Sequence, residues 1–107
     1  MDDDIRELLH ELKTRLTRFL AGRTFRLVLF GSRARGDHDD DSDIDVAIIV
    51  DDLSHELKDR VLDLVTNLEL ERLKPLSALV LSQADFDALR DRERRIALDI
   101  EEEGIVV

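Results

Sequence analysis

The chain has 107 residues, of which 43% are hydrophobic and 39% are charged, and its formal net charge is −10. This length favours one domain with a single core, and the excess of acid argues against nonspecific nucleic-acid binding because phosphates would be repelled. The absence of cysteine excludes disulfides and thiolate catalysis. No apolar run is long enough to span a membrane and no signal-peptide pattern opens the chain, so we expect a cytoplasmic protein without membrane contact.

Hydrophobic periodicity, together with capping and breaking residues, predicts four helices and three strands. In chain order we expect a helix at about 3–21, strands at 25–30 and 44–50, a helix at about 54–72, a strand at 76–81, a short helix from 82 and a last helix at about 91–103. The order α-β-β-α-β-α-α predicts an α/β (α+β) fold, with a small mixed β-sheet and helices packed on it. No repeat or linker interrupts it, so residues 1–107 are expected to form one domain.

Residues near both ends of the chain are expected to pack in specific ways. The first helix has an apolar stripe made of Ile5, Leu8, Leu9, Leu12, Leu16, Phe19 and Leu20. In the last helix, Ile96, Ala97 and Ile100 should point inward, while the cluster Arg92, Arg94 and Arg95 either pairs with neighbouring acids or docks a partner. The tail Ile105–Val107 is either an addition to the sheet edge or an exposed contact for another chain.

A glycine-serine corner follows the first strand directly. Gly31 would let a ligand approach the backbone closely, and a helical turn opening at Ser32 would present free N–H groups to an anion. Arg33 and Arg35 add cations beside it, so a phosphate would fit. The alternative is an ordinary turn after a strand.

Two carboxylates lie at the start of the second predicted strand. Asp43 and Asp45 are two residues apart, so on a strand they project to the same face and repel each other. A divalent cation between them would explain the pair, since Mg²⁺ prefers carboxylate and phosphate oxygens. A solvated acidic strand start is the alternative, which suits Asp43 better than Asp45.

A run of acids precedes this pair. Asp37, Asp39, Asp40 and Asp41 suggest a calcium loop, but from Asp37 an EF-hand would need glycine where Ser42 stands and glutamate where Ile48 stands. We therefore interpret the run as a solvated turn.

The segments Gly31-Ser32-Arg33-Ala34-Arg35-Gly36 and Ser42-Asp43-Ile44-Asp45-Val46 resemble the GS-x-A-R-G and SD-x-D motifs of the minimal nucleotidyltransferases, in the DNA-polymerase-β-like nucleotidyltransferase superfamily. Proteins of this size in that family resemble the antitoxin of HEPN/MNT toxin–antitoxin pairs.

The resemblance implies an enzyme that transfers AMP from ATP to a hydroxyl of a partner protein, a HEPN-type toxin. It implies that Asp43 and Asp45 are catalytic and hold two Mg²⁺ ions, and that Gly31, Ser32, Arg35 and Ser42 bind the nucleotide. It is compatible with an oligomer and gives no reason to expect direct nucleic-acid binding.

One position departs from the family pattern. The superfamily usually carries a third carboxylate on a later strand, where this chain has Ser77 within Leu76–Leu81. A serine is a weak metal ligand and a poor base. The alternative function is therefore a binding module of the same fold, with weak or no catalysis, which neutralises a helical partner by forming a complex.

Overall fold

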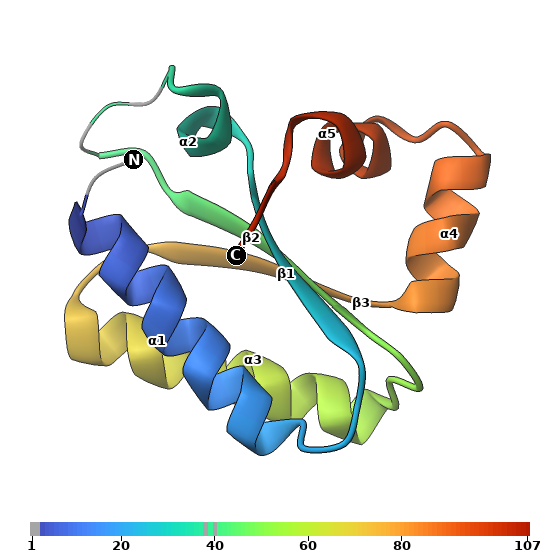
Figure 1. The fold of residues 1–107 in the computed structure, drawn as a ribbon, viewed down its shortest axis with the longest axis horizontal. Coiled ribbons are helices and arrows are strands. Elements are labelled where there is room, and N and C mark those ends of the chain that lie inside the picture. The colour runs from blue at the N-terminus through green and yellow to red at the C-terminus, as the bar shows by residue number, and fades with distance from the viewer. Residues whose placement is uncertain (1–2, 38, 40) are drawn as a thin grey trace.

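The computed structural model describes residues 3–37, 39 and 41–107. Its helices and strands alternate along the chain except near the C-terminus, where two helices follow each other (Figure 1). They are α1 (Asp3–Phe19), β1 (Phe25–Phe30), α2 (Ser32–Arg35), β2 (Ile44–Val50), α3 (His55–Arg72), β3 (Leu76–Ser82), α4 (Gln83–Asp91), α5 (Arg95–Glu103) and β4 (Ile105–Val106). The predicted fold class is confirmed, and the short α2 and β4 are added to the expected order.

The four strands form one mixed sheet in the order β3-β2-β1-β4. β1 lies antiparallel to β2 and to β4, whereas β2 and β3 are parallel, as expected for strands joined through the crossover helix α3. β4 is the tail of the chain, paired with Val28 and Leu29 of β1, so the tail extends the sheet edge.

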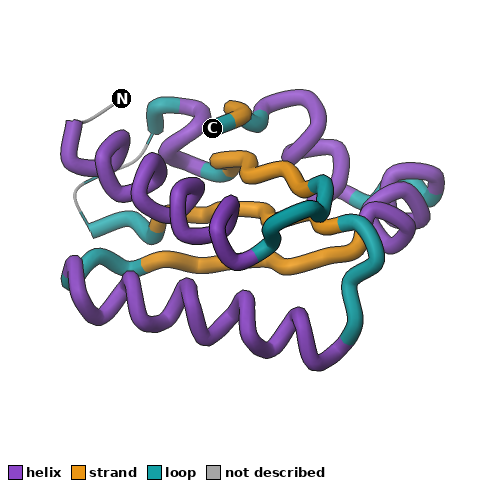
Figure 2. Tube along the Cα trace, turned by 60° about the horizontal axis from the view of Figure 1, so that its bottom comes forward, coloured by secondary structure: helices purple, strands orange, loops and turns teal. Residues whose placement is uncertain are grey.

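Helices cover both faces of the sheet (Figures 1 and 2). Alternate residues of β2 point to opposite faces. Ile44, Val46, Ile48 and Val50 pack with the buried residues of α1 and α3. Ala47 and Ile49 point the other way, into a smaller cluster with Phe86 of α4 and Ala97 and Ile100 of α5. Asp45 belongs to this second set by its position in the strand.

α1 begins with acidic residues, which suit the positive end of a helix dipole, and buries most of its predicted stripe. Leu12 and Leu16 are fully buried, but Phe19 is 39% exposed, so its expected place in the core is wrong. The helix ends at Phe19 rather than at about residue 21, in a turn that contains Gly22 at φ +84°, and Leu20 is buried as predicted.

Capping residues begin the next long helices as predicted. The Ser54 hydroxyl accepts a hydrogen bond from the Leu57 amide at 3.1 Å, and the Ser82 hydroxyl accepts one from the Asp85 amide at 3.0 Å.

Among the described helices, none is long and apolar enough to cross a membrane.

The last helix differs from its prediction in two respects. It begins at Arg95 rather than at about Asp91, because Glu93 adopts a left-handed backbone (φ 54°) that separates α4 from α5. Ile96 then falls in the first turn and is 40% exposed, whereas Ala97 and Ile100 are buried as predicted. In the basic cluster, Arg95 pairs with Asp99 at 3.5 Å.

Candidate active site

Gly31 occupies the corner between β1 and α2. Its backbone (φ 76°, ψ −156°) lies in a region that is essentially restricted to glycine. A Cβ at this position would collide with Asp45 Oδ2 and would lie 3.2 Å from the Asp45 Cγ. Gly31 is therefore needed both for the turn and for the approach of the backbone to the Asp45 carboxylate.

Asp45 lies near the start of β2, between the two neighbouring strands. Its Cα is paired with Phe30 of β1 and with Ser77 of β3. The side chain is half-buried. Partial burial raises the pKa of the Asp45 carboxyl, the nearby negative charge of Asp43 raises it further, and the positive charge of Arg35 acts in the opposite direction.

Asp43 immediately precedes β2 and is exposed. The next residue is anchored, since the Ile44 amide donates to the Pro75 carbonyl at 3.0 Å beside the start of β3. Because β2 begins at Ile44, strand alternation does not fix the face of Asp43, but its negative charge lies close enough to raise the pKa of Asp45.

The loop before this pair is held by its own hydrogen bonds. The Ser42 hydroxyl accepts from the Asp39 amide at 3.1 Å and donates to Asp39 Oδ1 at 3.2 Å. The Ser42 hydroxyl oxygen thus stabilises the turn in this structure, and its role in nucleotide binding stays a prediction. Of the acidic run, Asp37, Asp39 and Asp41 are exposed, and Asp40 lies outside the described residues.

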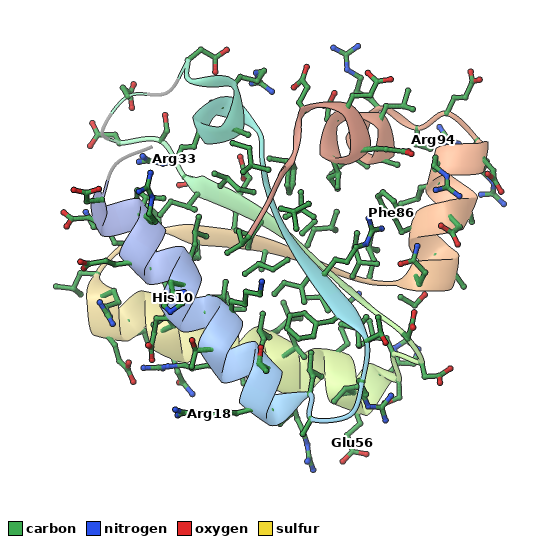
Figure 3. All side chains as sticks on the ribbon, viewed as in Figure 1. His10, Arg18, Arg33, Glu56, Phe86 and Arg94 are labelled. Carbon is green, nitrogen blue, oxygen red and sulfur yellow. The ribbon has the colours of Figure 1, made fainter. Side chains whose placement is uncertain are left out.

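Arg33 stands at the variable position of the motif, yet it makes a specific contact. Its guanidinium donates twice to the Ser42 carbonyl, from Nε at 3.2 Å and from Nη2 at 2.9 Å. Figure 3 shows Arg33 near the segment that leads into β2. Nothing in the sequence pairs Arg33 with Ser42, because the contact depends on how the loop folds back.

Arg35 lies between two acids. It contacts Asp37 Oδ2 and Glu103 Oε2, each at 3.3 Å, and these hydrogen bonds raise the pKa of its guanidinium, with Asp37 the larger cause. Glu103 is the last residue of α5, 68 positions away along the chain, so sequence reasoning missed it. Ser32 begins α2 directly after Gly31 and lies at the same corner.

Ser77 is the residue opposite Asp45 on β3, and it is exposed. In the part of the chain that the structure describes, no three His, Asp or Glu side chains lie close enough together to hold a metal ion. The donor set is therefore two carboxylates. Two adjacent carboxylates, one of them partly desolvated, could hold a divalent cation that takes its other ligands from water and phosphate, and the expected second Mg²⁺ ion stays a prediction.

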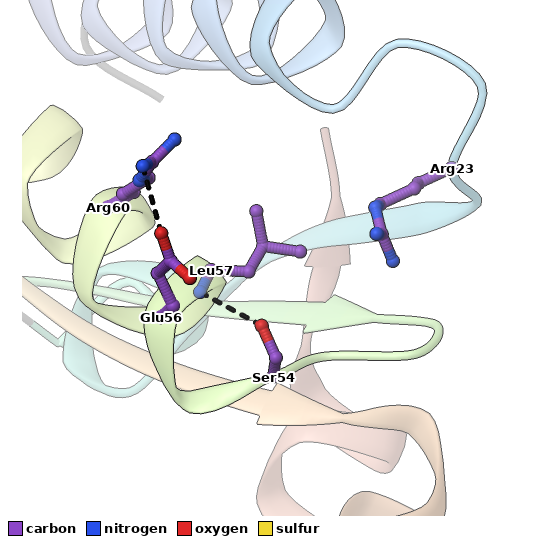
Figure 4. Close-up of a pocket in the computed structure, with 5 residues that line it drawn as sticks. All are labelled: Arg23, Ser54, Glu56, Leu57 and Arg60. Carbon is purple, nitrogen blue, oxygen red and sulfur yellow. Dashed lines mark hydrogen bonds and ion pairs between the residues drawn. The ribbon is translucent and has the colours of Figure 1, made fainter.

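A pocket of about 230 Å³ lies near the other end of β2, lined by Arg23, Ser54, Glu56, Leu57 and Arg60 (Figure 4). Its polar groups are already used within the chain. Arg60 pairs with Glu56 at 2.9 Å, the Ser54 hydroxyl caps α3, and Arg23 donates to the Asp52 carbonyl at 2.9 Å. This pocket is separate from the carboxylate pair.

Two acids beside a glycine corner on a mixed sheet define the candidate site, and comparisons with known proteins identify its family. A protein-family model described as "Polymerase beta, Nucleotidyltransferase" matches residues 23–107. "Putative protein adenylyltransferase MJ0141" of Methanocaldococcus jannaschii is 42% identical over 50 residues, or 47% of this chain and 50% of that protein. "Putative protein adenylyltransferase MJ0604" of the same organism is 39% identical over 83 residues, or 78% of this chain and 75% of that protein.

The chain belongs to the polymerase beta nucleotidyltransferase family and is a nucleotidyltransferase domain. The family recognised from the two motifs is therefore confirmed. The matched region spans half of the first relative and three quarters of the second.

Proposed function

We propose that this protein is a Mg²⁺-dependent adenylyltransferase that transfers AMP from ATP to a hydroxyl of a partner protein. The observation that carries the proposal is the half-buried Asp45, with Asp43 beside it, set against the bare backbone of Gly31. The two relatives named as protein adenylyltransferases support the choice of AMP and of a protein acceptor. We further propose that the partner is a HEPN-type toxin and that this chain is its antitoxin.

The proposed role of each residue follows from its position in the site. Asp43 and Asp45 would hold the cations, and the Gly31 backbone, which has no side chain between it and the Asp45 carboxylate, would lie close to the triphosphate. Ser32, at the same corner, and Arg35, whose charge acts on Asp45, would bind the phosphates. Mg²⁺, when bound, would offset the charge on the reacting phosphate and lower the pKa of the attacking hydroxyl.

The proposed transfer exchanges one bond at the α-phosphorus of ATP for another. The acceptor oxygen forms a bond to the α-phosphorus of ATP while the bond from that phosphorus to the bridging oxygen breaks. Pyrophosphate leaves with the electron pair, and the hydroxyl proton is released to water. Nothing is oxidised or reduced.

The test is label transfer. The protein is mixed with ATP labelled at the α-phosphate, Mg²⁺ and the purified product of the neighbouring gene. We expect label on the partner, lost with Asp43→Asn or Asp45→Asn and retained with Asp59→Asn, which removes the same charge from an exposed position on α3. Transfer that survives both site substitutions would contradict the proposal.

A second candidate is favoured by Ser77. Because this residue stands opposite Asp45 where a further carboxylate could have completed the site, the domain could act mainly by binding and occluding a helical partner. This function predicts no label transfer and a tight complex that tolerates both Asp43→Asn and Asp45→Asn.

A further inference from the structure

The loop that carries Asp43 is anchored on two sides. On one side, the Ile44 amide is bonded to the Pro75 carbonyl beside β3. On the other, the Arg33 guanidinium donates two hydrogen bonds to the Ser42 carbonyl, at 3.2 and 2.9 Å. That carbonyl belongs to the peptide joining Ser42 to Asp43, so the Arg33 contact lies one peptide away from a predicted cation ligand.

Packing does not hold the Asp43 side chain in place, because it is exposed, and its position therefore depends on the backbone. Asp45, by contrast, is held within β2 between two strands. Two ligands bind one cation more tightly when the distance between their oxygens is fixed in advance, and residues that orient ligands commonly change metal affinity 10- to 100-fold. Arg33, half-buried and bonded through two donors, is suited to this task.

We propose that Arg33 is a positioning residue that clamps the Ser42–Asp43 peptide and so sets the Asp43 carboxylate relative to Asp45 for cation binding. The inference rests on the proposed function in one respect only, the binding of a divalent cation by these two carboxylates. It assigns Arg33 a task within the protein rather than a contact with the phosphates.

The direction of the change in cation affinity distinguishes a clamp from an arginine that acts only through its charge. An arginine acting only through its charge would repel a cation, so its removal should tighten cation binding. An arginine that contacts the triphosphate should leave binding of the cation alone unchanged and should weaken nucleotide binding measured without metal. A clamp predicts weaker cation binding in the absence of any nucleotide.

The experiment measures Mg²⁺ and Mn²⁺ binding to the full chain by calorimetry, without nucleotide. For Arg33→Ala we expect roughly tenfold weaker binding and faster amide exchange at Asp43. For Arg33→Lys, which keeps the charge and can donate to one carbonyl without the guanidinium fork, we expect a smaller loss. The matched control is Arg94→Ala, an exposed arginine on the far side of the molecule in Figure 3, which should bind as the unaltered chain does.

Each outcome supports the clamp or overturns it. Unchanged or tighter cation binding in Arg33→Ala, with a normal circular dichroism spectrum, overturns the clamp and leaves the proposed transferase standing. If Arg33→Ala does not fold, Arg33→Lys takes its place, since it retains the charge and loses the fork, and cation binding equal to that of the unaltered chain then overturns the clamp. Failure of the unaltered chain to bind either cation overturns both the clamp and the Mg²⁺-dependent function.

Discussion

Gly31→Ala tests the close approach of the backbone to Asp45 most directly. The substitution forces an alanine into a backbone region that costs about 1–3 kcal/mol for a residue with a side chain. The new methyl would also collide with Asp45 Oδ2 and lie 3.2 Å from its Cγ, and such overpacking costs about 1–3 kcal/mol more. We expect the free energy of unfolding to fall by about 3–4 kcal/mol.

The measurement is thermal unfolding followed by circular dichroism. At about 2.1 cal/mol/K per residue, this chain has an unfolding entropy of roughly 0.22 kcal/mol/K, so the loss corresponds to a fall in Tm of about 15 °C. Gly36→Ala is the matched control, because Gly36 also has a positive φ (81°) but an added Cβ would meet nothing within 4 Å. It should cost only about 1 kcal/mol, the ordinary cost of a left-handed alanine.

A double substitution separates the collision from the backbone cost. Asp45→Ala removes the carboxylate that the new methyl would strike, so Gly31→Ala should be less damaging in that background by at least about 1 kcal/mol. If the two substitutions are additive within about 0.5 kcal/mol, or if Gly31→Ala and Gly36→Ala lower Tm equally, Gly31 does not lie directly against the Asp45 carboxylate.

Three further predictions concern the carboxylates and the first helix. Because the pKa of Asp45 is raised, the folded state binds the Asp45 proton more tightly than the unfolded state does. The contribution of Asp45 to stability is therefore greatest at acidic pH. It is lost as the pH rises past the unfolded pKa of about 3.9 and through the folded pKa. Asp45→Asn should therefore raise Tm at pH 7 but not at pH 3, and an equal effect at both values would contradict this. Ser77→Asp should tighten Mn²⁺ binding and lower Tm without metal, because it places a third negative charge opposite Asp45; a Tm that does not fall would place the new carboxylate elsewhere. Leu12→Ala, at a fully buried position of α1, should lower the free energy of unfolding in urea by about 2–5 kcal/mol. This loss is expected even though the matched family region begins only at residue 23. Thr14→Ala, at a partly exposed position on the same helix, is the control.

Much of the fold was predictable because its signals are local. The spacing of leucines in α1, the serine caps of α3 and α4 and the apolar runs of the strands each act within a few residues. The errors fall where elements end. Phe19 and Ile96 have the right spacing for burial, but their exposure depends on where a helix begins or terminates against the rest of the molecule.

The two acids were singled out from their spacing in the sequence, but Asp43 precedes β2, so strand alternation does not set its face, and the role of both acids stays a prediction. The family pattern pointed to Ser77 as the place of the missing carboxylate, but its pairing with Asp45 depends on strand register. The contact of Arg35 with Glu103 was not found, because it joins residues 68 positions apart. Such contacts follow from packing of whole elements, which periodicity does not encode.

The elements, the family and the acid pair thus follow from the amino-acid sequence, since helix formation, strand formation and motif spacing are governed by neighbouring residues. The folded chain was needed to show that Gly31 passes directly against the Asp45 carboxylate and that Arg33 holds the peptide before Asp43. Both contacts arise when a loop closes between paired strands. Their geometry is therefore set by strand register and by the path of the loop rather than by any residue type alone.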